Sequence, residues 1–106
     1  MVKNYLGEFE ELVLLTVAVM NGEAYGVLIT QDILARTGRS VQISAVHVAL
    51  YRLEEKGLVR SKLGGATKER GGRRKRLFSI TAAGRNVLSD IRNVREQLWS
   101  LLPKPG

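Results

Sequence analysis

The sequence predicts a mainly α-helical fold with one small β-hairpin, and three observations support this prediction. Three apolar segments between residues 8 and 55 have helical spacing and end near asparagine or glycine. Two short strand-like segments then flank a glycine-rich basic loop. A last helical segment with a regular apolar seam follows residue 81. This order of elements is typical of a winged helix-turn-helix followed by a C-terminal dimerisation helix.

The first two helices are expected at residues 8–20 and 26–37. The first is apolar on almost every side, which is expected of a helix buried on more than one face, and Asn21 and Gly22 end it. The second has apolar side chains at helical spacing, and Gly38 suits the left-handed conformation just past a helix end. Both helices are therefore expected to form the core of one small domain.

The third helix is expected to begin at Ser44, whose hydroxyl suits the N-cap position. Ile43 and Val48 have the spacing of a hydrophobic staple, and Gly57 ends the helix. Its two faces differ in character, because each residue rotates the helix by about 100°. The expected buried face holds Val46, Ala49, Leu50 and Leu53, and the opposite face holds His47, Val48, Tyr51, Arg52 and Glu55.

The formal net charge of +7 is concentrated in one segment of the sequence. Residues 60–76 contain eight basic side chains and one acidic side chain, whereas both flanking segments are close to neutral. Strands expected at residues 58–62 and 76–80 would hold the intervening glycine-rich loop beside the third helix. Adjacent cations repel one another, so their concentration here indicates a polyanionic partner rather than an ordinary solvated surface.

Composition excludes several classes of function. The chain has no cysteine and a single histidine, so it can assemble neither a nucleophile with its base nor a cysteine-type metal site. We therefore expect no enzyme activity, no cofactor and no bound metal. No run reaches the roughly 18 apolar residues of a membrane span, and the N-terminal segment lacks the features of a signal peptide. A cytoplasmic location without a membrane partner is expected.

Four stretches of the sequence together resemble the PadR family of transcriptional regulators. They are LGEFEELVLL at residues 6–15, AYGVLI at 24–29, LYRLEEKGLVRS at 50–61 and GGRRKRLFSITAAG at 71–84. The resemblance implies a winged-helix protein, usually a repressor, that dimerises through a helix C-terminal to the wing and responds to aromatic or drug-like effectors. Members of the family commonly carry a DNA-contacting tyrosine early in the third helix, where this chain has His47.

The expected partner is double-stranded DNA with a pseudo-palindromic operator sequence, because a two-fold dimer presents two equivalent reading surfaces. A winged helix places its third helix in the major groove and its wing along the phosphate backbone or an adjacent minor groove. The residues expected to contact DNA are Ser44, His47, Val48, Tyr51 and Arg52 of the third helix, and Arg70, Arg73, Arg74, Lys75 and Arg76 of the wing.

The C-terminal helix is expected to begin after Thr81 and to form a homodimer. Its apolar residues alternate between spacings of four and three, the pattern of a heptad seam that needs a partner helix. The first helix of the same chain is an alternative partner, but both helices are too apolar for a monomer of this size. Residues 1–80 are thus expected to form the winged helix-turn-helix, and residues 81–102 the dimerisation helix of one compact unit. The expected interface residues are Phe9, Val13, Val87, Ile91, Val94, Leu98 and Leu101.

Trp99, the only tryptophan, lies beside this seam and is the expected contact for a small planar aromatic effector. Ordinary packing at the interface is the alternative role for this side chain. Two further classes of function stay open beside a sequence-specific regulator. They are a general nucleic-acid-binding protein without sequence specificity, which would share the basic segment, and a winged-helix module that binds protein, which would not need it.

Overall fold

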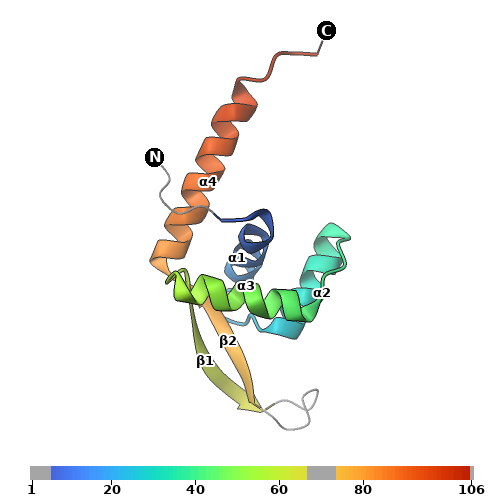
Figure 1. Cartoon of the computed structure of the whole chain (residues 1–106), viewed down its shortest axis with the longest axis vertical. Coiled ribbons are helices and arrows are strands. Elements are labelled where there is room, and N and C mark those ends of the chain that lie inside the picture. Colours follow the sequence, from blue (N-terminus) through green and yellow to red (C-terminus); the bar gives the residue numbers. More distant parts are fainter. Residues whose placement is uncertain (1–5, 67–73, 106) are drawn as a thin grey trace.

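The computed structural model describes residues 6–66 and 74–105, which form four helices and one antiparallel hairpin (Figure 1). Residues 1–5, 67–73 and 106 lie outside the described residues. The predicted class, mainly α-helical with a small β-hairpin, is confirmed. The elements in chain order are α1 (Glu8–Met20), α2 (Gly26–Thr37), α3 (Ile43–Glu55), β1 (Val59–Ala66), β2 (Arg74–Ile80) and α4 (Ala82–Ser100).

Helix α1 lies at the centre of the molecule and contacts α2, α3, α4 and β2. Its side chains Val13, Leu14 and Val17 are completely buried. The rest of the core comes mainly from one face each of α2 and α3 and from the start of the hairpin. In Figure 1, α3 crosses in front of α1, and α2 flanks the pair. Because burying one large aliphatic side chain contributes about 1.5–3 kcal/mol, the enclosed α1 is a major source of stability.

The ends predicted for α1 and α2 are confirmed. Asn21 and Gly38 adopt the left-handed conformation just past these helices, with φ of 52° and 74°. Their amide groups donate hydrogen bonds to the carbonyl oxygens of Ala18 and Leu34. Gly57, with φ of 74°, has the same conformation after α3. Glycine and asparagine adopt this backbone conformation more easily than other residues do, which explains why the helices stop there.

The start of α3 differs from the prediction. The helix begins at Ile43, and the carbonyl oxygen of the N-cap residue Gln42 accepts its first hydrogen bond. Ser44 lies inside the first turn, so the predicted Ser44 cap is wrong. The predicted staple is wrong as well, because Ile43 is helical and both Ile43 and Val48 are exposed. Val41 packs against the core just before this point, and its packing brings the chain into the helix earlier than a serine cap would.

The hairpin is longer than predicted. Strand β1 extends to Ala66 and β2 begins at Arg74, whereas the sequence pattern predicts strands at residues 58–62 and 76–80. The strands continue outward because backbone hydrogen bonds between them do not require the apolar alternation on which the shorter prediction rests. The register shifts beyond Leu63, so the outer part of the hairpin is irregular.

A short bridge attaches the hairpin to the helical body. The register pairs Val59 with Ile80 at the inner end of the hairpin. On the other side of β2, the Phe78 amide donates a hydrogen bond to the Ala24 carbonyl oxygen at 2.7 Å. The Ala24 segment lies between α1 and α2, so β2 is joined both to β1 and to the turn that precedes α2.

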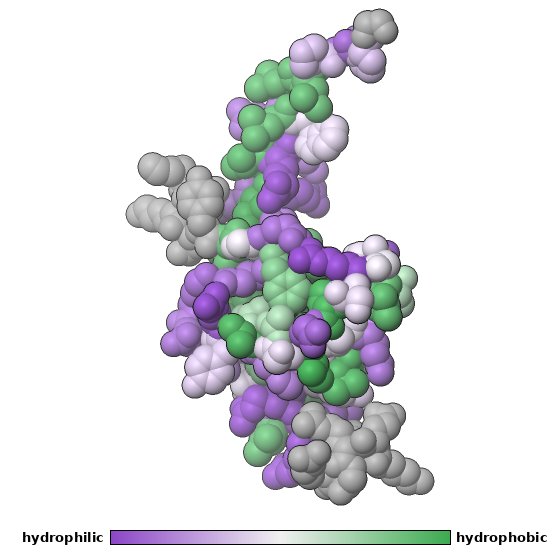
Figure 2. All heavy atoms as spheres, turned by 45° about the vertical axis from the view of Figure 1, so that its right-hand side comes forward, coloured by the Kyte–Doolittle hydropathy of each residue, from purple (hydrophilic) through white to green (hydrophobic). Residues whose placement is uncertain are grey.

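Helix α4 begins at a capped and tightly packed turn. The Thr81 hydroxyl accepts a hydrogen bond from the Gly84 amide at 3.0 Å and donates one to the Gly57 carbonyl oxygen at 2.7 Å, which confirms the predicted cap. Gly84 is buried against Leu58 and Ile80. The first half of α4 packs on the body, whereas its second half projects beyond it (Figure 1). Figure 2 shows apolar residues gathered along one side of this projection.

We predict that Gly84→Ala destabilises the protein, although alanine favours helix more than glycine. The new methyl group would collide with the Leu58 carbonyl oxygen and lie 2.7 Å from the Ile80 side chain. The collision involves backbone, so the expected net loss is about 1–2 kcal/mol after the gain in helix propensity. Urea unfolding measures the change, with Asn86→Ala at an exposed position of α4 as the control. Unchanged or increased stability of Gly84→Ala would contradict this packing.

Candidate nucleic-acid interface

Helix α3 turns one face to the core and the other to solvent, as its sequence predicts. The residues Val46, Ala49, Leu50 and Leu53 are buried. His47, Val48, Tyr51 and Arg52 are all exposed, and Tyr51 has 70% of its surface accessible. Exposure of a large aromatic side chain next to other partly apolar groups is typical of a binding surface.

Strand β2 divides the basic residues of the hairpin between two faces. Successive side chains of a strand point to opposite faces, and Arg74 and Arg76 line the side nearest α3. Lys75 lies on the other side, where its ammonium nitrogen is 4.5 Å from the centre of the Tyr25 ring. This cation–π contact ties the strand to the residue that precedes α2. Among the described basic residues of the predicted wing, two therefore face α3 and one faces away.

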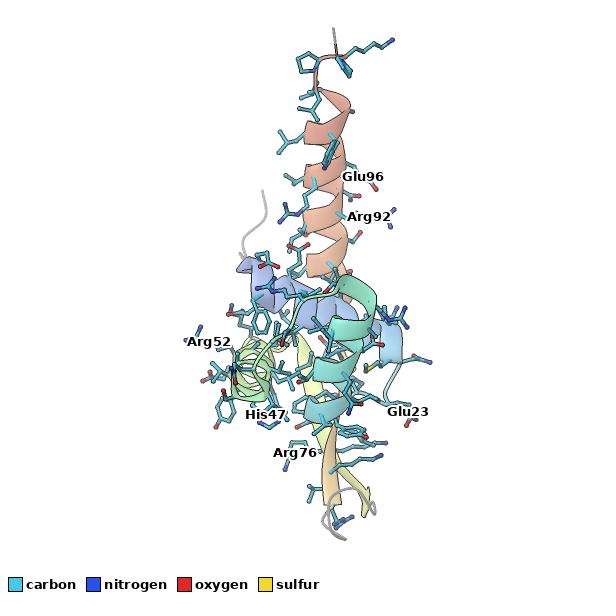
Figure 3. All side chains as sticks on the ribbon, turned by 90° about the vertical axis from the view of Figure 1, so that its right-hand side faces the viewer. Glu23, His47, Arg52, Arg76, Arg92 and Glu96 are labelled. Carbon is cyan, nitrogen blue, oxygen red and sulfur yellow. The ribbon has the colours of Figure 1, made fainter. Side chains whose placement is uncertain are left out.

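A groove of about 530 Å³ lies between α3 and the hairpin, and we call it the α3–wing groove. Figure 3 shows His47 and Arg76 on the same side of the molecule. Two guanidinium groups beside aromatic and imidazole rings suit a partner that carries both phosphates and bases. The groove is lined by Gly26, His47, Leu50, Tyr51, Glu54, Leu63, Arg74, Arg76 and Phe78.

The ring of His47 packs directly on Gly26, the first residue of α2. A methyl group at position 26 would collide with the ring nitrogen Nε2 of His47. The absence of a side chain on Gly26 thus makes room for the imidazole, and α2 supports it from behind. His47 remains exposed on its other side, so the ring is held at the edge of the α3–wing groove and faces solvent.

Arg52 lies apart from the groove. Its guanidinium group is 3.8 Å from the carboxylate of Glu10 on α1, which also pairs with Lys56 at 2.8 Å. Figure 3 shows Arg52 well separated from Arg76. The two cations share one carboxylate that is only 14% exposed, which joins α3 to α1, while the Arg52 side chain is 64% exposed.

The other predicted contact residues have three different positions. Ser44 and Val48 are exposed on α3 and do not line the groove. Lys75 makes the contact with Tyr25 described above. Arg70 and Arg73 lie outside the described residues.

Two polar residues near the groove were not expected from the sequence. The Ser61 hydroxyl donates a hydrogen bond to Oε2 of Glu54 at 2.7 Å and accepts one from Nη1 of Arg76 at 3.1 Å. In the sequence, Glu54 has the features of an ordinary surface charge on a helix. The only signal for this cluster is the strand register, which pairs Ser61 with Phe78 and so places its side chain on the same face as Arg76.

The predicted dimer residues fall into two groups. Val13 and Val87 are 0% and 6% exposed, so the prediction that they contact a partner is wrong. They are enclosed where α1 and the first half of α4 pack on each other within one chain. Phe9 and Ile91 are partly buried against the same core. On the second half of α4 and just beyond it, the exposed apolar residues are Val94, Leu98, Trp99, Leu101 and Leu102.

A second hollow, also about 530 Å³, lies between α1 and α4. Leu15 and Trp99 contribute to its wall, and the Trp99 side chain is 72% exposed. An ion pair of 3.0 Å between Arg95 and Glu11 joins the two helices at this hollow. The wall thus combines apolar side chains with several charged ones.

Metal and membrane sites find no support in the described residues. Residues 6–66 and 74–105 contain no group of three or more side chains that could hold a metal ion. Over the same ranges, no helix has both the length and the apolar character needed to cross a membrane.

Comparisons with known proteins agree with this geometry. Residues 14–90 match the family described as Transcriptional regulator PadR-like family, and a search of curated proteins finds no match. A PadR-like transcription factor from Bacteroides fragilis has a TM-score of 0.74, with 20% identity over 87% of this chain and 84% of that chain. The putative transcriptional regulator TA0346 from Thermoplasma acidophilum has a TM-score of 0.64, with 22% identity over 90% and 94%. Bacillus subtilis PadR in complex with operator DNA has a TM-score of 0.66, with 19% identity over 93% and 50%.

The fold is that of a winged-helix protein, and the family match places it in the transcriptional regulator class. The family match covers most of the 106 residues. The chain belongs to the PadR-like family of transcriptional regulators.

Proposed function

We propose that this chain is a DNA-binding transcriptional repressor that acts as a homodimer on pseudo-palindromic operator sites. The observation that carries the proposal is the exposed face of α3 beside the arginine face of β2, because both line one groove. Membership of the PadR-like family supports the same function. The similarity in fold to Bacillus subtilis PadR, which was solved with operator DNA, is a further support.

The two parts of the surface have different roles in this proposal. The major groove of B-DNA, about 12 Å wide, admits one α-helix, and we assign that position to α3. His47, Val48 and Tyr51 then reach the base edges, and the Ser44 hydroxyl contacts a phosphate near the start of the helix. Arg74 of the wing binds a phosphate, which adds affinity that does not depend on sequence.

Dimerisation through the second half of α4 is supported by its exposed apolar side chains. Leu98 and Leu101 are 61% and 72% exposed, and a contiguous apolar surface of this kind usually marks an interaction site. Together with Val94 they have the spacing of a heptad seam, which suits the same helix from a second copy. In this proposal, residues 81–102 form the dimerisation helix on a DNA-binding unit of residues 1–80.

We also propose that a small planar aromatic effector releases the repressor from DNA. The hollow between α1 and α4 has a volume within the range of small-molecule sites, about 300–1,000 Å³. In a dimer formed along α4, the Trp99 ring at the edge of this hollow would lie near the Trp99 ring of the second copy, and the two rings would contribute aromatic faces for stacking. Because Trp99 lines this hollow and also borders a shallow pocket with Leu98 of the proposed seam, a ligand held by Trp99 would alter how the two DNA-binding units are spaced.

Selection from random duplexes should recover an inverted repeat with half-sites about 10 bp apart or a multiple of that spacing.

Arg74→Ala should weaken binding to all sequences alike and reduce the log–log salt slope by about one, because one phosphate contact is lost. Arg36→Ala, a cation at the far end of α2 that pairs with Asp32, is the control and should leave the slope unchanged. Recovery of no inverted repeat, with equal affinity for RNA, would instead favour a general nucleic-acid-binding protein.

Leu98→Glu should abolish dimerisation and operator binding together. The substitution would place two carboxylates opposite each other across the two-fold axis, which costs about 3 kcal/mol or more and weakens association by roughly 100-fold. Analytical ultracentrifugation and gel-shift assays measure the two effects. Gln97→Glu adds the same charge at the neighbouring position away from the seam and should retain the dimer. A wild-type monomer at micromolar concentration would refute the proposed assembly.

Trp99 emission should respond to the effector. Titration with phenolic acids and planar aromatic cations should quench or shift the emission saturably, and the ligands that do so should lower operator affinity because coupling between two sites is reciprocal. Aliphatic acids of similar size are the control. A broad aromatic panel that changes neither emission nor operator affinity would leave Trp99 as a packing residue of the interface.

A further inference from the structure

Two arginines on the same face of β2 are held in different ways. Nε of Arg74 donates a hydrogen bond to the Gly64 carbonyl oxygen at 3.1 Å, so this side chain is fixed to the hairpin's own backbone. Nη1 of Arg76 donates to the Ser61 hydroxyl at 3.1 Å, and Ser61 in turn donates to Glu54 at 2.7 Å. Arg76 is therefore connected through Ser61 to α3, whereas Arg74 is hydrogen-bonded to the backbone of the hairpin.

The chain of hydrogen bonds has a defined direction. The single proton of the Ser61 hydroxyl goes to the Glu54 carboxylate, so its lone pairs face the Arg76 guanidinium. Each bond pairs a neutral hydroxyl with a charged group, and charge-assisted hydrogen bonds are shorter and stronger than neutral ones. Ser61 thus lies between a carboxylate on α3 and a guanidinium on β2 and orients both.

This cluster is better suited to positioning than to stability. Glu54 and Arg76 are exposed, and exposed polar pairs contribute little to the free energy of folding. A guanidinium has five N–H donors, and the contact to Ser61 uses one of them. Arg76 lines the α3–wing groove together with His47 and Tyr51, so its remaining donors lie at the surface proposed to contact DNA.

We infer that Glu54 and Ser61 are positioning residues that hold Arg76 in a fixed place relative to α3, so that Arg76 acts with the recognition helix in sequence selection. Arg74, in contrast, acts as a phosphate contact of the wing. This inference rests on the proposed DNA-binding function. The inference gives Arg74 and Arg76 different roles, although both belong to the same basic segment of the sequence.

The carboxylate of Glu54 has two separable effects on DNA. Its negative charge lies in a groove proposed to face phosphates, so it weakens binding to every sequence. Its hydrogen bond to Ser61 affects the affinity only of complexes in which Arg76 and α3 must contact the DNA together. Glu54→Gln removes the charge but keeps an oxygen that accepts from Ser61, whereas Glu54→Ala removes both.

The test measures the affinity of the full-length protein for the selected operator and for a random duplex of equal length at one salt concentration. Ser61→Ala, Glu54→Ala and Arg76→Ala should each lower the ratio of the two affinities by about 3- to 10-fold. Ser61→Thr and Glu54→Gln should keep the ratio, and both Glu54 variants should bind random DNA more tightly. Arg74→Ala should weaken both duplexes and leave the ratio unchanged.

The double variant Ser61→Ala/Arg76→Ala tests whether Ser61 affects sequence selection through Arg76. Its affinity ratio should equal that of Arg76→Ala alone, because Ser61 acts through Arg76. Additive losses, or a ratio unchanged in Ser61→Ala while that variant melts at the wild-type temperature, would overturn the inference. A wild-type protein that does not distinguish operator from random DNA would overturn the proposed function instead, so the two failures give different results.

Discussion

The side chains of Val13, Leu14 and Val17 are enclosed on all sides, and their enclosure requires α2, α3, α4 and β2 to pack around α1. A chain of this size buries only about 60–65% of the surface that its unfolded form exposes. A single central helix therefore serves as the support for every neighbouring element. Because one face of α3 packs on the core, the opposite face is exposed to solvent, and no other element is needed to expose it.

A second constraint acts at Leu58, where three elements meet. Its amide donates a hydrogen bond to the carbonyl oxygen of Leu53 in α3, and its carbonyl oxygen accepts one from Thr81 before α4. Gly84 packs on the same carbonyl group, and β1 begins at the next residue. Helix α3, the hairpin and the start of α4 are thus joined through one residue.

Periodicity was sufficient to predict the helices and their buried faces, but it did not predict features that depend on packing or register. The Ser44 cap failed because a capping hydroxyl contributes only about 1 kcal/mol, and the packing of Val41 on the core decides the start of α3. Val13 and Val87 failed as interface residues because an apolar helix has the same sequence pattern whether its partner belongs to the same chain or to another. The contact between Ser61 and Arg76 requires the strand register, which composition does not contain.

The length of α4 beyond its packed first turn has a geometric consequence. The helix has 19 residues, and at 1.5 Å per residue it is about 28 Å long. A rotation of about 10° about its buried first turn would displace the far end by about 5 Å, more than the rise of three residues. The same relation holds in reverse: in the proposed dimer, a shift of a few ångströms where two such helices cross would turn each attached body through several degrees. The long arm would then convert a small change in side-chain packing at its tip into a change of angle at the surface that carries α3.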